Sequence, residues 1–140
     1  MLLDASQLNH VRRSFAEAAP RPDLGLRFYA HLFRRDPSLR HLLPAQLDTQ
    51  AERLMAMIAL AVNKLGDLSN LVPVLQQLGR RHVAYGVTEA QYAVVGAAFL
   101  DTLAEVLGAD FTDARREAWT AVYGLMARTM IDAGHEEEAA

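Results

Sequence analysis

The stretch LVPVLQQLGRRHVAYG, residues 71–86, has the pattern of an amphipathic helix that begins at Pro73. Apolar spacing of 4, 3, 4 and 3 residues gives this helix one inward face, formed by Leu71, Leu75, Leu78, His82 and Tyr85. His82 therefore occupies a position where the pattern favours an apolar residue. Gly79 has no side chain, so another group can approach the helix closely there. Gly86 is expected to end the helix.

An inward histidine on an apolar face has two interpretations. A neutral imidazole can serve as the axial ligand of a haem iron where water does not compete for the metal. Alternatively, His82 is a core residue whose ring nitrogens are satisfied by hydrogen bonds. Taken alone, the helix favours the core histidine.

Composition limits the classes of function. The 140 residues suit one domain with a sizeable core, and 51% apolar and 22% charged residues are ordinary for a globular protein. A net charge of -3 predicts no general attraction to nucleic acid or to an anionic membrane surface. The absence of cysteine excludes disulfides, iron–sulfur clusters and thiolate-ligated haem.

No targeting or membrane-spanning segment is expected. The beginning of the chain, MLLDASQ, lacks the basic region and the long apolar core of a signal peptide. The longest uninterrupted apolar run, residues 54–62, is far shorter than a membrane span. We therefore expect a cytoplasmic protein that does not insert into membranes.

The rest of the chain has helical periodicity and no strand-like alternation. Asp4 begins a first helix with Gln7 as its capping-box partner, and Thr88 and Gln91 form a second such box. Further helices are expected at approximately residues 23–35, 37–42, 48–65, 89–107 and from 113 onward. The prediction is an all-α domain of seven or eight helices over residues 1–133, followed by an acidic, frayed tail over 134–140.

Polar residues interrupt two other apolar stripes. Tyr29 lies on the stripe of the second helix with Leu26 and Phe33, and a buried phenol needs a hydrogen-bond partner. The helix that we expect Asp48 to cap carries Gln50 on the same face as Leu54, Met57 and Ala61. Tyr85 and Trp119 are expected in the core.

These features together resemble a bacterial globin of the single-domain, flavohaemoglobin-like (Vitreoscilla haemoglobin-like) family. The phrases FYAHLF, LRHLL, LGRRHVAYGV, QYAVVG and AWTAVYG follow that family's order, and the resemblance covers nearly the whole chain. It resides mainly in the interval from Gln50 to His82, the phrase around Tyr29, and the step from His82 to Tyr92.

The resemblance implies a globin fold that encloses haem b between the Gln50 helix and the His82 helix. His82 would be the proximal ligand of the metal, and Tyr29 and Gln50 would face the open sixth position. Leu54 would floor that distal pocket. The other residues assigned to the haem site are Leu43, Arg81, which would pair with a haem propionate, Tyr92 and Val95.

Two positions depart from the family pattern. Leu43 stands where the family usually has a phenylalanine packed on the haem, so aromatic packing is lost there. Gly134 stands where the family tends to have a glutamate joined to the proximal histidine through a tyrosine, the position that Tyr92 matches. Without that carboxylate, unless Glu136 or a neighbour replaces it, a dedicated peroxidase is disfavoured.

Three functions from different classes remain open at this point. The first is reversible binding of O₂, with NO and CO as alternative ligands, for storage, transport or sensing. The second is an enzyme, a nitric oxide dioxygenase for nitric oxide detoxification that relies on a separate reductase. The third is a haem-free globin-fold sensor module.

Overall fold

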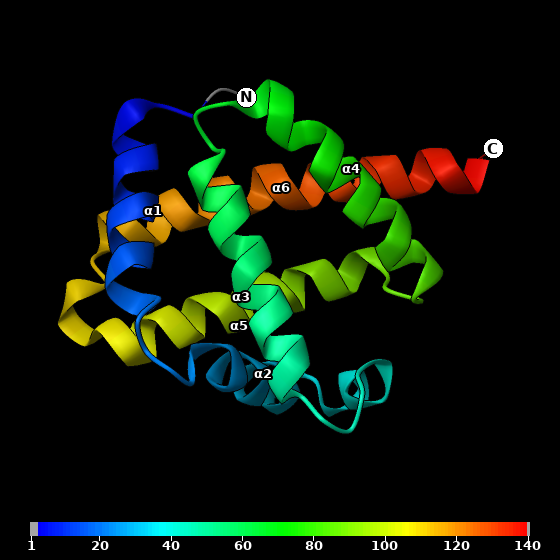
Figure 1. Ribbon diagram of the computed structural model, residues 1–140, viewed down its shortest axis with the longest axis horizontal. Coiled ribbons are helices and arrows are strands. Elements are labelled where there is room, and N and C mark those ends of the chain that lie inside the picture. Colours follow the sequence, from blue (N-terminus) through cyan, green and yellow to red (C-terminus); the bar gives the residue numbers. More distant parts are fainter. Residues whose placement is uncertain (1–2, 140) are drawn as a thin grey trace.

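The computed structural model describes residues 3–139 and is entirely helical in this part of the chain, which confirms the predicted all-α class (Figure 1). Six α-helices and two short 3₁₀ helices follow one another along the chain. They are α1 (Ala5–Ala18), α2 (Leu24–Arg35), η1 (Pro37–Leu42), α3 (Asp48–Asn63), α4 (Leu68–Ala84), α5 (Glu89–Leu107), η2 (Gly108–Asp110) and α6 (Asp113–Ala139).

Three helix pairs dominate the packing. Helix α6 runs along the length of the molecule and packs against α4 and α1, while α5 packs against α2 (Figure 1). Helix α3 lies against α2 and α1. Within residues 3–139, α3 and α4 barely touch each other. The two helices are therefore held in place by α1, α2 and α6 rather than by each other.

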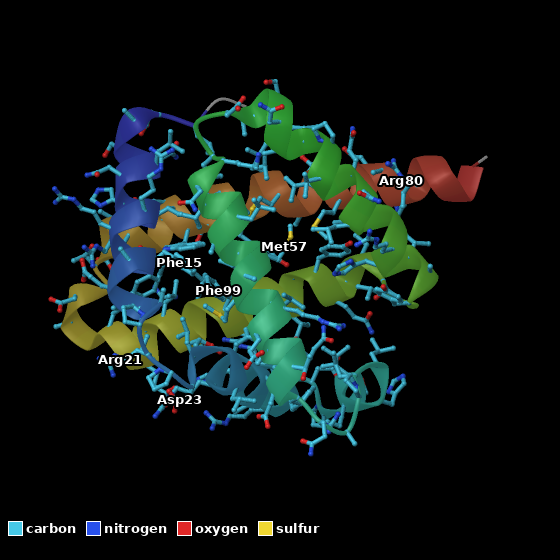
Figure 2. All side chains as sticks on the ribbon, in the orientation of Figure 1. Phe15, Arg21, Asp23, Met57, Arg80 and Phe99 are labelled. Carbon is cyan, nitrogen blue, oxygen red and sulfur yellow. The ribbon has the colours of Figure 1, made fainter. Side chains whose placement is uncertain are left out.

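An aromatic cluster forms the centre of the core. The Trp119 ring lies edge-on to Phe99, with 5.1 Å between centroids, and tilted against Phe15 at 6.4 Å. Both phenylalanines point into the interior in Figure 2. Trp119 donates its indole N–H to Ser14 Oγ at 2.8 Å, so its polar atom is satisfied. Burying one such side chain contributes about 1.5–3 kcal/mol to the free energy of unfolding. This burial holds α6 against α1 and α5.

Several helix ends lie where the sequence predicted them. The capping boxes of Asp4 with Gln7 and of Thr88 with Gln91 are both present. Helix α5 ends at Leu107 because Gly108 adopts a φ of 55°, a left-handed conformation that side chains rarely take. Helix α6 begins at Asp113 as predicted, and Thr112 Oγ1 caps it by accepting the backbone N–H of Arg115.

The beginnings of two helices differ from the predictions. Helix α4 begins at Leu68, so Pro73 lies inside it rather than opening it. The Asp67 carboxylate accepts hydrogen bonds from the side chains of Ser69 and Asn70, which organises this earlier start. In α3 the N-cap is Leu47, whose carbonyl already accepts a helical bond, and Asp48 is the first helical residue.

Two residues predicted to face inward are exposed. Leu26 is 40% exposed, because the buried face of α2 is rotated toward Leu24 and Phe28. Phe28 packs edge-on against Phe99 of α5 at 6.2 Å between centroids, which fixes that rotation. Tyr85 is 65% exposed, because α4 ends at Ala84 and the apolar period continues past the end of the helix.

Helix α5 is long and apolar enough to cross a membrane by length and composition, with a mean hydropathy of 1.4 over residues Glu89–Asp110. The same properties suit the central helix of a globular core. Helix α5 buries residues along its whole length, from Tyr92 to Val106, against α2, α1 and α6. Packing in the core therefore accounts for part of its apolar character.

Helix α6 continues to Ala139, and its last turns extend past α4 in Figure 1. Gly134 is buried in its contact with α4. The division into a domain over residues 1–133 and a tail over 134–140 stays a prediction.

Candidate functional site

His82 lies in the last turn of α4, and its side chain is half-buried on the inner face of that helix. Its Nδ1 lies 2.7 Å from the backbone carbonyl of Leu78, one turn earlier. A carbonyl can only accept, so Nδ1 carries the hydrogen and Nε2 carries the lone pair. Burial lowers the pKa of the imidazole, and the bond to Leu78 offsets part of that effect. The ring is therefore held neutral with Nε2 available to bind a metal.

Gly79 allows a close crossing of α4 and α6. A Cβ atom at Gly79 would lie 2.1 Å from the Met130 carbonyl oxygen and 2.7 Å from the Met130 Cα. The prediction that another group approaches the helix here is confirmed, and that group is the backbone of α6. This crossing fixes the half of α4 that carries His82.

Gly86 supports the position of His82 from the other side. Its φ is 88°, and its N–H bonds to the Val83 carbonyl, while the N–H of Val87 bonds to the His82 carbonyl at 2.9 Å. These two bonds form a Schellman motif that closes the helix directly after the histidine. The chain then turns into α5 without fraying the turn that carries His82.

Tyr29 and Gln50 come together from two different helices. Tyr29 is buried on α2, with its ring stacked on Phe33 at 6.0 Å between centroids. Gln50 lies in the first turn of α3 and is half-buried. Burial raises the pKa of the Tyr29 phenol, and interaction with the Gln50 side chain lowers it by a smaller amount. Gln50 therefore lies close enough to the Tyr29 phenol to affect its pKa, and the assignment of both residues to one distal pocket stays a prediction.

The apolar faces near these polar groups are incompletely covered. Leu54 and Met57 of α3, Leu43 after η1 and Val95 of α5 are each half-buried. Figure 2 shows Met57 lying between α3 and α4, whereas Arg80 points outward from α4. Half-buried apolar side chains such as these can contact a flat apolar group. With the free Nε2 of His82, these residues fit a haem.

Arg81 lies on the exposed side of the last turn of α4, next to His82. It makes no ion pair with another side chain in the described part of the chain. Its assignment to a propionate of the cofactor stays a prediction.

Tyr92 is buried beside His82, with 6.1 Å between ring centroids. Its hydroxyl is buried and has no hydrogen-bond partner among the described residues. Burial raises the pKa of this phenol, so it stays protonated. An unsatisfied buried hydroxyl costs about 1–3 kcal/mol. Tyr123 lies next to it but donates its own hydroxyl to the Tyr92 carbonyl at 2.6 Å.

Gly134 lies where the resemblance would place a glutamate, and its surroundings explain why a side chain is absent. A Cβ atom at Gly134 would lie 2.5 Å from Val83 Cγ2, on the turn of α4 that follows Gly79. A glutamate would require Val83 to change its rotamer or α4 and α6 to move apart. The side chain of Glu136 lies outside the described residues.

Helical periodicity does not reveal the role of the Leu78 carbonyl, which orients the His82 ring. The sequence gives a usable signal for it, since a carbonyl four residues before a helical residue lies below its side chain. The contribution of Met130 could not be found in this way, because its backbone meets Gly79 only through the crossing of two helices.

Comparison with known proteins places this geometry in a family. The sequence profile of the Globin family matches residues 26–130. A flavohemoprotein of Bordetella parapertussis is 36% identical over 107 residues, which are 74% of this chain and 27% of that protein. The chain thus spans about a quarter of the length of the curated relatives that it matches.

Solved structures agree on the fold. A bacterial globin from Campylobacter jejuni superimposes with a TM-score of 0.85 at 23% identity, covering 98% of this chain and 100% of that one. A flavohemoglobin from Malassezia yamatoensis, solved with bound FAD and heme, gives a TM-score of 0.81 at 20% identity, with 98% of this chain and 38% of that one covered.

Proposed function

Because this chain belongs to the globin family, we propose that it binds haem b through His82 and reversibly binds O₂ and related diatomic gases at the open position of the iron. When bound, the haem supplies a ferrous iron with one free coordination site. The cytoplasm is the compartment we propose. Attachment of the haem through cysteine is impossible, because the chain has none.

The observation that carries the proposal is the hydrogen bond from His82 Nδ1 to the Leu78 carbonyl. It directs Nε2 away from the helix backbone and keeps it unprotonated. A core histidine would use both nitrogens in hydrogen bonds, but Nε2 of His82 has no protein partner in the described part of the chain.

Tyr29 and Gln50 supply the polar groups of the proposed gas site. The Tyr29 phenol stays protonated at neutral pH, because burial raises its pKa. A protonated phenol can donate a hydrogen bond to a diatomic ligand that carries partial negative charge. Neither a phenol nor an amide side chain is a strong ligand of ferrous iron, so the sixth position stays open.

A second candidate function is nitric oxide dioxygenase activity with a separate reductase. An identity of 36% to a flavohemoprotein favours this function. The similarity covers only about a quarter of that longer protein, so we propose the reductase as a separate partner. The same Tyr29 and Gln50 pair would orient the gas in both functions. Gly134 weighs against enzymatic O–O cleavage, because the Tyr92 hydroxyl has no carboxylate partner among the described residues.

The test is the absorption spectrum of the purified, reduced protein with and without O₂, together with the haem content per chain. We expect a Soret band that shifts reversibly with O₂. His82→Ala should lose most of the haem and unfold at a lower temperature, because a ligand bound only by the native state stabilises it. A haem-free parent protein, or full haem retention in His82→Ala, would refute the proposal.

Sustained consumption of NO with an added flavin reductase would assign the protein to the enzyme class. Reversible O₂ binding without such turnover would assign it to the binding class.

A further inference from the structure

Arg40 lies in η1, and its guanidinium binds the backbone of the segment that follows. It donates to the carbonyl oxygens of Pro44 at 2.9 Å and Ala45 at 3.0 Å, and more distantly to that of Leu43 at 3.4 Å. A planar guanidinium carries five N–H donors in a fixed fork, so it can bind several carbonyls at once. Arg40 makes no ion pair among the residues that the structure describes. Its donors therefore hold the irregular segment between η1 and α3.

The same guanidinium contacts an aromatic side chain of α2. Its central carbon lies 5.3 Å from the ring centroid of Phe33, within the range of a cation–π contact. The Phe33 ring in turn stacks on that of the buried Tyr29, with 6.0 Å between centroids and 22° between planes. Phe28 meets the Tyr29 ring edge-on at 5.2 Å. Contacts thus run from the segment after η1, through Arg40 and Phe33, to the Tyr29 side chain.

We propose that Arg40 is a positioning residue for the Tyr29 phenol, which it holds in place through Phe33. The inference rests on the proposed binding of a diatomic gas beside Tyr29. The energy of a hydrogen bond falls steeply with distance and angle, so a small displacement of the phenol weakens its bond to O₂. CO is less polar when bound and depends much less on that bond. Arg40 thereby contributes to the preference of the pocket for O₂ over CO.

A second arginine supplies the matched control. The central carbon of Arg116 lies 5.0 Å from the ring centroid of Phe111, so it makes the same kind of contact as Arg40 does with Phe33. Arg116 is exposed near the beginning of α6, which lies on the opposite side of the molecule from η1 (Figure 1). Arg116→Ala therefore removes a cation–π contact without disturbing the contacts that reach Tyr29.

Two substitutions of Arg40 and one double variant separate its contacts. Arg40→Ala removes all of them. Arg40→Lys keeps a cation near Phe33, but a lysine ammonium lacks the planar fork that binds neighbouring carbonyls. Arg40→Ala is also made in the Tyr29→Phe protein, because two residues that act through one hydrogen bond have non-additive effects.

Haem content and the Soret band are measured first on each protein. Stopped flow then gives the O₂ and CO dissociation rates, and infrared spectroscopy of the CO complex gives the C–O stretching frequency, which reports polar groups beside the ligand. Arg40→Ala should release O₂ roughly 3- to 10-fold faster, release CO at nearly the parent rate, and raise the stretching frequency. Arg40→Lys should be intermediate, and Arg116→Ala should match the parent. In the Tyr29→Phe protein, Arg40→Ala should cause no further acceleration.

The hold on the segment after η1 is tested separately on the purified protein, whether or not it carries haem. Limited digestion with chymotrypsin follows cleavage after Leu42 and Leu47, which flank the bound carbonyls. Cleavage should become faster in Arg40→Ala but not in Arg116→Ala, because a segment that loses its hydrogen bonds opens more often. Equal cleavage of Arg40→Ala and the parent would refute this step.

Three further results would overturn the inference. One is an unchanged O₂ rate in Arg40→Ala, and another is equal acceleration of O₂ and CO, which would indicate a pocket that is merely more open. The third is the same acceleration in the Tyr29→Phe protein, because Arg40 would then act independently of the phenol. If Tyr29→Phe released O₂ at the parent rate, or if the parent lacked a Soret band, the proposed function itself would be refuted, and this inference with it.

Discussion

The closest contact between α4 and α6 can be tested by adding one methyl group. In Gly79→Ala the new Cβ would lie 2.1 Å from the Met130 carbonyl oxygen, whereas ordinary contacts begin near 3.4 Å. Both partners are helix backbone, so relief requires the two helices to separate. Overpacking of this kind costs typically about 1–3 kcal/mol, and more where backbone must move.

Alanine has a higher helix propensity than glycine, which offsets about 1 kcal/mol of the cost of overpacking. We therefore expect Gly79→Ala to lower the free energy of unfolding by roughly 2 kcal/mol in the haem-free protein. For a chain of this size, that corresponds to a decrease in Tm of roughly 4–8 °C. Since the same crossing supports the turn of His82, haem loss to an acceptor globin should also become faster.

Gly124 supplies the matched control. It lies inside α6, and a Cβ atom there would meet nothing within 4 Å. Gly124→Ala should therefore stabilise the protein by roughly 0.5–1 kcal/mol through helix propensity alone. Urea unfolding followed by circular dichroism measures both variants. If Gly79→Ala were as stable as the parent, or gained as much as Gly124→Ala, the tight crossing of α4 and α6 would be wrong.

Three further predictions concern the pocket and one ion pair. Tyr29→Phe removes a hydrogen bond to a polar ligand, which is worth roughly 1.5–3 kcal/mol. Because about 1.4 kcal/mol corresponds to a tenfold change in rate, O₂ dissociation measured by stopped flow should become roughly 10- to 150-fold faster. CO dissociation should change much less, and an unchanged O₂ rate would make Tyr29 a core residue only. Leu43→Phe should slow haem loss, because an aromatic ring adds packing energy on the order of 1 kcal/mol. Faster haem loss would show a pocket shaped for leucine. The hydrogen bond from Arg35 holds the pKa of the Asp101 carboxyl below its usual value of 3.8, so this pair stabilises the fold above that pH and ceases to do so as acid protonates Asp101. Asp101→Asn should therefore slightly lower the free energy of unfolding at neutral pH, and this difference should shrink as the pH falls through the lowered pKa of Asp101. A difference that does not change with pH would contradict the assignment.

Local signals in the sequence predicted much of this fold. The bounds of α5, Glu89 and Leu107, follow from the capping box of Thr88 and from Gly108, whose free backbone ends the helix. The inward position of His82 follows from the 3-and-4 spacing in α4. Signals of this kind act over one or two turns, so they can be read without knowing what the helix packs against.

Contacts between distant segments decided the rest. Tyr29 and Gln50 interact only because α3 packs on α2, and Leu26 is exposed because Phe99 of α5 holds Phe28 inward. The space beside Gly134 is filled by Val83 across the helix crossing. The sequence by itself determined an all-helical chain with a histidine directed inward. Only the tertiary structure decided which groups meet that histidine, because helix periodicity fixes the face of a residue and not the partner that covers it.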